Sequence, residues 1–160
     1  MKKKGDELMI LHTKNLHTKI FRDGANIRKK VFVEEQQRPL RVEFTYDEAK
    51  CIHLVYYIDQ RPAGTLRLYP LSAHIAKIQR VAILPEFRGQ KLGSKIIAAG
   101  ENLAREYGYL AVVLDAQEHA IPFYDKLNYV PTGEETFILP KTTILHLPMI
   151  KQLEPLEQLA

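Results

Sequence analysis

The sequence predicts an α/β (α+β) fold in which a mixed, mostly antiparallel sheet is flanked by helices on both faces. Two apolar, β-branched segments enclose the turn Asp59–Pro62, which is the pattern of an antiparallel hairpin. Further along, an apolar strand, an amphipathic helix and a second apolar strand follow one another, as in a crossover between strands. The chain has 160 residues, so we expect one domain over residues 1–160.

Seven segments are predicted as strands because they are rich in apolar, β-branched or aromatic residues. Leu110–Leu114 is a continuous apolar run, which is typical of a strand buried on both faces. Gln36–Tyr46 contains Pro39 and alternates poorly, so we interpret it as a charged loop. In chain order, the expected strands are Asp6–Thr13, Cys51–Ile58, Ala63–Tyr69, Ala76–Leu84, Leu110–Leu114, Phe137–Leu139 and Thr143–Met149.

Three segments have the apolar spacing of helices. The first covers residues 16–32, and the second covers Leu92–Tyr107 and ends at Gly108, as helices often end at glycine. The third, Ala120–Leu127, is short and is closed by Asn128, which tolerates the left-handed conformation better than most residues.

Composition excludes several classes of protein. The formal charge of +4 is spread along the chain, which argues against a nucleic-acid partner. Cys51 is the one cysteine, so no intrachain disulfide forms, and no Cys/His spacing indicates a metal site. The lysines at the N-terminus are followed by acidic residues, where a secretory signal peptide would have its apolar region. No apolar run is long enough to cross a membrane. We therefore expect a cytoplasmic protein without a membrane partner.

The stretch Gln79–Ser94, QRVAILPEFRGQKLGS, has the composition of an anion-binding loop. An apolar run stops at Pro85, Gly89 and Gly93 follow, and a helix then begins. The N–H groups of a helix N-terminus attract phosphate, and glycine lets the backbone approach it closely. From these residues alone, an ordinary strand-to-helix turn stays an equal alternative. Two nucleotide-binding patterns fit poorly, because G-x-G-x-x-G is missing and a P-loop would need the order Gly-Lys-Ser.

Four blocks of the chain resemble one enzyme family. Arg88–Gly93 is similar to the [QR]-x-x-G-x-[GA] acyl-CoA loop of the GNAT superfamily of N-acetyltransferases. VFVEEQ at 31–36, LDAQEHAIPFYDKLNYVP at 114–131 and His146–Met149 resemble its ElaA/YjcF-like branch. Lys91 stands where the loop pattern has its central glycine, so we expect an ordinary helical or turn conformation there.

The resemblance implies a GNAT fold and acetyl transfer from acetyl-CoA, used as a cosubstrate without a metal, to a small primary amine. It implies that backbone N–H groups of the loop hold the CoA pyrophosphate, while the preceding strand pairs with the pantetheine arm where two strands diverge. Gln117 follows a central strand, where ligands gather in α/β sheets, so we expect it at the pantetheine arm or the acceptor. The implied cofactor-binding residues are Val81, Ala82, Ile83, Arg88, Gly89, Gln90, Lys91, Leu92, Gly93, Ser94 and Gln117.

Tyr124 is the candidate general acid, because the family places a tyrosine at this helix position against the thioester sulfur. The alternative is that Tyr124 only packs against the sheet. Glu35 is the candidate base or a clamp on a cationic substrate, with His119, His146 and a water relay as alternatives for the base. Cys51 is interpreted as a core residue.

An alternative function is a non-catalytic acyl-CoA-binding sensor or regulatory module. A homodimer paired through C-terminal strands, which this fold often forms, stays open beside the monomer.

Overall fold

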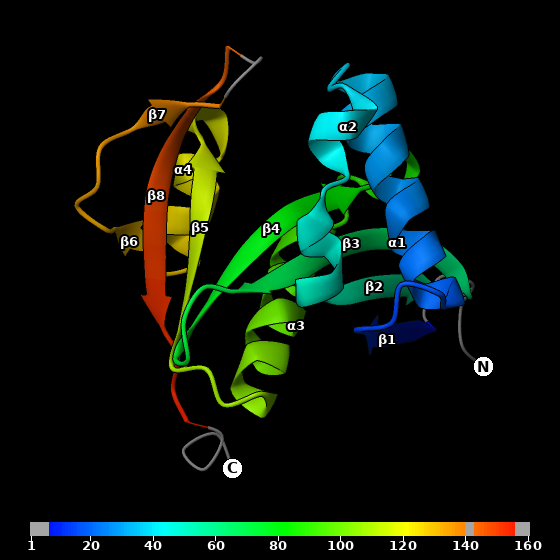
Figure 1. The fold of residues 1–160 in the computed structure, drawn as a ribbon, viewed down its shortest axis with the longest axis horizontal. Coiled ribbons are helices and arrows are strands. Elements are labelled where there is room, and N and C mark those ends of the chain that lie inside the picture. The colour runs from blue at the N-terminus through cyan, green and yellow to red at the C-terminus, as the bar shows by residue number, and fades with distance from the viewer. Residues whose placement is uncertain (1–6, 140–142, 156–160) are drawn as a thin grey trace.

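The structure is a computed structural model that describes residues 7–139 and 143–155. These residues form one eight-stranded sheet in the order β1-β2-β3-β4-β5-β8-β6, with β7 paired to β8 (Figure 1). The β4–β5 pair is parallel and the other pairs are antiparallel. The strands are β1 Leu8–Thr13, β2 Ile52–Ile58, β3 Arg61–Pro70, β4 Ile75–Ile83, β5 Ala111–Gln117, β6 Val130–Pro131, β7 Phe137–Ile138 and β8 Leu145–Gln152. The helices are α1 Lys19–Arg28, α2 Leu40–Glu43, α3 Leu92–Glu106 and α4 Ile121–Lys126, with a π-helical segment at Lys29–Glu35 and 3₁₀ turns at Tyr46–Lys50, Pro85–Phe87 and Glu118–Ala120.

The predicted fold class and order of elements are confirmed, with two additions. The expected loop over residues 36–46 contains the four-residue helix α2, which begins after Pro39. The local sequence favours this helical turn only weakly. Glu43 at its end is fully buried and forms ion pairs with other elements, so tertiary contacts stabilise the turn. Val130–Pro131 adds the short strand β6 beside β8.

The first helix is shorter and less regular than predicted. It begins after Thr18, whose hydroxyl accepts a hydrogen bond from the Phe21 N–H at 3.3 Å and so caps the helix. After Arg28 the chain continues as the π-helical segment, where the Gln36 N–H donates to the Val31 carbonyl at 3.1 Å. Such wide turns are frequent at functional sites, and this one ends at the cleft described below.

Helices α1 and α3 cover opposite faces of the sheet. Successive residues of a strand point to opposite faces, and Thr65 and Leu66 are neighbours on β3. A Cβ on Gly24 of α1 would lie 2.9 Å from the Thr65 hydroxyl, and a Cβ on Gly100 of α3 would lie 2.8 Å from a Leu66 methyl. Glycine therefore lets each helix approach its face closely, as the prediction of helices on both faces requires.

Strands β4 and β5 pair at one end and then diverge. Their register covers three positions, Ile75 to Lys77 on β4. Beyond it, Thr65 lies opposite Ala82 but Arg67 lies opposite Gln79, so two β4 residues face one β3 residue. The first residue of this β-bulge is Arg80, which has a left-handed φ of 57°. The expected divergence of the two strands is thus present, and a bulge in β4 lies beside it.

Candidate active site

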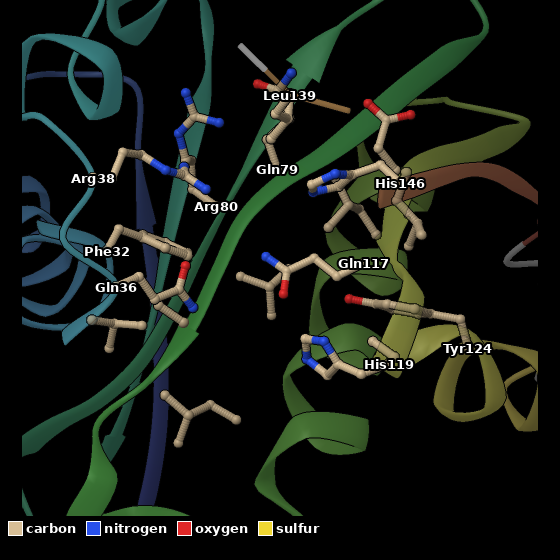
Figure 2. A pocket seen from close by; sticks show the side chains of 18 of the residues that line it. Phe32, Gln36, Arg38, Gln79, Arg80, Gln117, His119, Tyr124, Leu139 and His146 are labelled. Carbon is tan, nitrogen blue, oxygen red and sulfur yellow. The ribbon is translucent and has the colours of Figure 1, made fainter. Parts of the chain in front are cut away.

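A cleft of about 510 Å³ lies where β4 and β5 diverge. One wall comes from β4 and the π-helical segment, and the other from β5, α4 and β8. Figure 2 shows Phe32, Gln36, Arg38 and Arg80 on one side and Gln117, His119, Tyr124 and His146 on the other. The volume is typical of small-molecule sites. The structure therefore brings together residues from sequence positions 31 to 146.

The loop before α3 has the features expected of an anion site. Gly89 has a φ of 81°, which favours glycine, and the side chain of Ser94 donates to the Lys91 carbonyl at 3.0 Å. No side chain in the described residues caps α3, and its first turn contains no acidic residue. The first N–H groups of a helix have no intrahelical partner, so here they stay without a side-chain cap and form the positive end of the helix dipole.

The prediction for Lys91 is wrong. Its φ of 59° and ψ of 23° are left-handed, a conformation that glycine adopts without strain. The loop is held at both sides, because Phe87 before it and Leu92 after it are buried in the core. Tertiary packing thus imposes on Lys91 a conformation that costs a non-glycine residue about 1–2 kcal/mol.

Arg88 is held by Glu35 across the cleft rim. Its guanidinium donates to both Glu35 carboxylate oxygens, at 2.7 and 2.9 Å, and through Nε to the Ile83 carbonyl at 3.0 Å. Both side chains are 42% exposed, so this pair adds little to stability. The hydrogen bonds from Arg88 lower the pKa of Glu35, which makes this carboxylate a weaker base. The Arg88 N–H already donates to Pro85, so residues 89–94 offer the remaining loop amides.

The edge of β4 exposes alternate backbone groups to the cleft. The Leu84 N–H donates to the Ala63 carbonyl on β3, so the pairing of alternate residues turns Ala82 toward β3 as well. Val81 and Ile83 then face the other way, where β5 has diverged. Of the three predicted residues, Val81 therefore offers its backbone groups to a ligand, and Ile83 offers its N–H, because the Ile83 carbonyl already accepts from Arg88. Ala82 lines the cleft without offering either group.

Tyr124 lies in the cleft wall, on α4. Its ring packs edge-on against Phe123 at 5.0 Å and Tyr129 at 5.7 Å between ring centroids, which fixes its direction. Burial raises the pKa of Tyr124 to about 12, so the phenol is a proton donor throughout the physiological pH range. No described residue forms a hydrogen bond with its hydroxyl. Gln117 extends toward the middle of the same cleft (Figure 2).

Two histidines line the cleft, His119 after β5 and His146 on β8. The Nδ1 atom of His146 lies 2.9 Å from the Ile144 carbonyl, which can only accept, so Nδ1 carries the proton and Nε2 keeps a lone pair. Burial lowers the pKa of His146, with the bond to Ile144 acting in the opposite direction. His146 is therefore a neutral imidazole with one basic nitrogen at physiological pH.

A buried cluster of charges beside the cleft was not predicted. The Glu43 carboxylate contacts Arg28 at 2.8 Å, Arg38 at 2.9 Å and Arg80 at 3.3 Å, and Glu43 has no exposed surface. A hint in the sequence was the position of Arg80 inside a segment predicted as a strand.

A second carboxylate, Glu48, completes this cluster. It pairs with Arg28 at 2.8 Å and with Arg67 on β3. Arg67 in turn donates to the Gln79 side-chain oxygen at 2.9 Å. The cluster thus connects α1 and α2 to β3 and β4, and it fixes the wall of the cleft that contains Arg38 and Arg80.

Cys51 is completely buried and does not line the cleft, and burial raises its pKa to about 11. This confirms the interpretation of Cys51 as a core residue. Residues 7–139 and 143–155 contain no group of three or more His, Cys, Asp or Glu side chains placed to hold a metal ion. None of the helices in this described part has the length and apolar content needed to cross a bilayer.

The fold and the cleft define the class of protein, an acyl-CoA-dependent acetyltransferase. Residues 16–129 match the description "Acetyltransferase (GNAT) family", and the chain belongs to this family. A Bacillus subtilis (strain 168) protein with an acetyltransferase name is 38% identical over 89% of this chain and 93% of its own length. YjcF of the same strain, an uncharacterized N-acetyltransferase, is 32% identical over 81% of this chain and 91% of its own.

Solved structures share the fold, and two of them serve as examples. Escherichia coli ElaA superposes with a TM-score of 0.75 and 21% identity, covering 91% of this chain and 98% of ElaA. A GNAT family acetyltransferase from Elizabethkingia anophelis, with acetyl-CoA bound, has a TM-score of 0.66 and 14% identity, covering 92% and 99%. With the likeness to YjcF, the predicted ElaA/YjcF-like GNAT membership is confirmed.

Proposed function

We propose that this protein is an N-acetyltransferase that moves the acetyl group of acetyl-CoA to a primary amine by direct attack in a ternary complex. One observation carries the proposal: a single cleft is lined by an unpaired strand edge and a buried phenol, and Arg88 in its lining is the first residue of the loop that leads to an uncapped helix N-terminus. Residues 89–94 at this N-terminus themselves lie outside the lining. These three features match the pyrophosphate, the pantetheine arm and the leaving thiolate of one ligand. The fold neighbour from Elizabethkingia anophelis holds acetyl-CoA, which supports the choice of ligand.

Acetyl-CoA would bind along the cleft. Its pyrophosphate lies on the N–H groups of residues 89–94, where the α3 dipole and Lys91 favour negative charge. Its pantetheine arm pairs with the backbone of Val81 and with the Ile83 N–H, since β5 leaves these groups unpaired. Gln117 contacts the arm or the acceptor from the opposite wall.

The chemical step needs no enzyme nucleophile. The amine nitrogen attacks the thioester carbonyl carbon, an N–C bond forms, and the tetrahedral oxyanion is stabilised by the Val81 N–H. The C–S bond then breaks, and the departing thiolate takes the proton of the Tyr124 hydroxyl. The amine loses its own proton to a base, and solvent returns a proton to Tyr124. Burial disfavours a charged thiolate as it does a phenolate, and so favours protonation of the departing sulfur.

We propose His146 as the proton acceptor and Glu35 as a positioning residue. His146 Nε2 has a lone pair and its ring lines the cleft, whereas the Glu35 carboxylate is occupied by both Arg88 nitrogens. Glu35 then acts by holding Arg88 and the start of the cofactor loop. His119 and a water relay are the alternative acceptors.

His146→Asn is expected to lower kcat by about tenfold to a hundredfold at pH 8. The difference from the native enzyme should narrow only when the pH falls below the lowered pKa of His146, because the native imidazole is protonated there and cannot accept a proton. Because the pKa of His146 is lowered, its imidazole is in the basic form above the usual value of 6.5, so the variant should differ most from the native enzyme in that range. Initial rates of the native and His146→Asn enzymes, measured from pH 8 downward, give this difference, with His119→Asn as the matched variant. A constant ratio of native to variant rates at all pH values would contradict the role.

Release of CoA thiol from acetyl-CoA, followed with a broad panel of primary amines, tests the proposed function. Turnover with mass-spectrometric detection of the N-acetylated amine supports it. Binding of acetyl-CoA without turnover of any amine would favour a sensor or regulatory module. No binding of acetyl-CoA would contradict both functions.

A further inference from the structure

We propose that the acceptor amine also carries an anionic group, a carboxylate or a phosphate, and that Arg38, Arg80 and Gln79 bind this group in the cleft. The inference rests on the proposed function, because it names the substrate class of the same site. It follows from an excess of positive charge, from the direction of three donors and from their separation from the cofactor loop.

Positive charge is in excess on this wall of the cleft. The neighbouring pairs Lys77–Asp115, at 2.7 Å, and Arg88–Glu35 balance themselves. The buried cluster does not, because four guanidiniums share two carboxylates. Its members are Arg28, Arg38, Arg67, Arg80, Glu43 and Glu48. Buried charge is unfavourable unless it is paired, so an anion at this wall would complete the cluster.

Arg38 and Arg80 are the members of the cluster that reach the cleft. Arg38 donates through Nη1 to Glu43, and its guanidinium stacks on Phe32 with 4.8 Å to the ring centroid. Arg80 has only long contacts, at 3.4 Å to the carbonyls of Val42 and Glu43 and 3.3 Å to the Glu43 carboxylate. No other hydrogen-bond partner for these guanidiniums occurs among the described residues.

Burial and the neighbouring guanidiniums lower the pKa of Arg80 to about 10, although Glu43 raises it. Arg80 is still charged at neutral pH, and this shift agrees with a guanidinium that lacks a full counter-charge. A bidentate carboxylate or phosphate is the ligand that the guanidinium fork fits best.

Gln79 adds a neutral donor with a fixed direction. Arg67 has donors only, so the Gln79 oxygen must face Arg67 Nε, at 2.9 Å. The amide nitrogen of Gln79 is thereby turned away from Arg67, and the residue lines the cleft beside Arg80 (Figure 2). Three side chains thus offer hydrogen-bond donors to one end of the cleft.

This donor group is distinct from the cofactor loop. A Cβ on Gly93, at the start of α3, would lie 3.8 Å from Ile83, so the loop meets the far end of β4. Arg80 instead contacts carbonyls of α2, and Figure 2 shows Arg38 and Arg80 across the cleft from Tyr124. The excess charge repels cationic amines such as polyamines, and it lowers the pKa of a bound amine, which favours the nucleophilic neutral form.

Matched acceptors test the inference. We would measure kcat/KM by thiol release for ω-amino carboxylates of increasing chain length, their carboxamides and the corresponding diamines, with amino-alkyl phosphates beside amino alcohols. The carboxylate or the phosphate series should exceed its uncharged partner by at least about tenfold, since a charged hydrogen bond is worth roughly that factor. Comparison of kcat/KM between the carboxylate series and the phosphate series shows which of the two anions the site binds.

Gln79→Glu is the discriminating variant, because it keeps the shape and the bond to Arg67 but places a negative charge in the cleft. It should lower the ratio of kcat/KM for anionic acceptors to kcat/KM for their uncharged partners by about tenfold or more. Gln60→Glu, the same change at the exposed β2–β3 turn, is the control and should leave this ratio unchanged. If Gln79→Glu unfolds, Arg38→Gln gives the same comparison.

Equal use of carboxylates, amides and diamines, or a Gln79→Glu enzyme with unchanged preference, would overturn the inference and leave the proposed function standing. A protein that binds no acetyl-CoA and acetylates nothing would overturn both.

Discussion

Tyr124→Phe is expected to lower kcat by about a hundredfold or more while acetyl-CoA still binds, because a positioned general acid contributes roughly 10²–10⁴. The variant removes the hydroxyl and keeps the ring, whose edge-on contacts with Phe123 and Tyr129 need no oxygen. No described residue forms a hydrogen bond with the Tyr124 hydroxyl, so the fold loses little. Single-turnover thiol release reports the chemical step, and calorimetric titration reports the binding.

Tyr107→Phe is the matched control for this prediction. It deletes the same atom at the opposite end of α3 from the cofactor loop, and Tyr107 does not line the cleft. Its activity should equal that of the native protein. A Tyr124→Phe enzyme with native kcat would show that Tyr124 only packs against the sheet, which is the alternative that the sequence left open.

Glu43→Gln is expected to destabilise the fold by about 3–5 kcal/mol, the usual effect of removing one partner from a buried ion pair. The Glu43 carboxylate neutralises three guanidiniums at once, those of Arg28, Arg38 and Arg80. Glutamine has nearly the same shape, but it leaves these cations with Glu48 as the remaining carboxylate of the cluster. The free energy of unfolding in denaturant measures the loss.

Glu106→Gln makes the same chemical change at an exposed position near the end of α3 and should alter the free energy of unfolding by less than about 0.5 kcal/mol. If Glu43→Gln were as stable as Glu106→Gln, the buried cluster would not hold α1 and α2 on the sheet as described.

The elements that the sequence predicted well depend on local signals. In the β2–β3 turn, Asp59 and Gln60 both have positive φ, at 49° and 66°, as a two-residue hairpin needs. Gly108 and Asn128 end their helices with φ of 85° and 72°. Asp59, Gly108 and Asn128 adopt positive φ more readily than most residues, so the local sequence suffices to predict this turn and these helix ends.

The features that were missed depend on distant contacts. Arg80 meets Glu43 from 37 residues away, so nothing next to either residue reveals that the carboxylate is buried and shared. Lys91 is left-handed because flanking core residues fix the loop, against the preference of lysine itself. Likewise, Glu35 was a plausible base by position, and only the structure shows Arg88 occupying its carboxylate.

Amide hydrogen exchange with and without acetyl-CoA tests the central claim most directly, namely that one cleft between β4 and β5 holds the cofactor. The account predicts slower exchange at Val81 and Ile83 and across residues 89–94, with little change in the exposed β2–β3 turn. Unchanged exchange in both segments, or protection confined to another part of the chain, would contradict the claim.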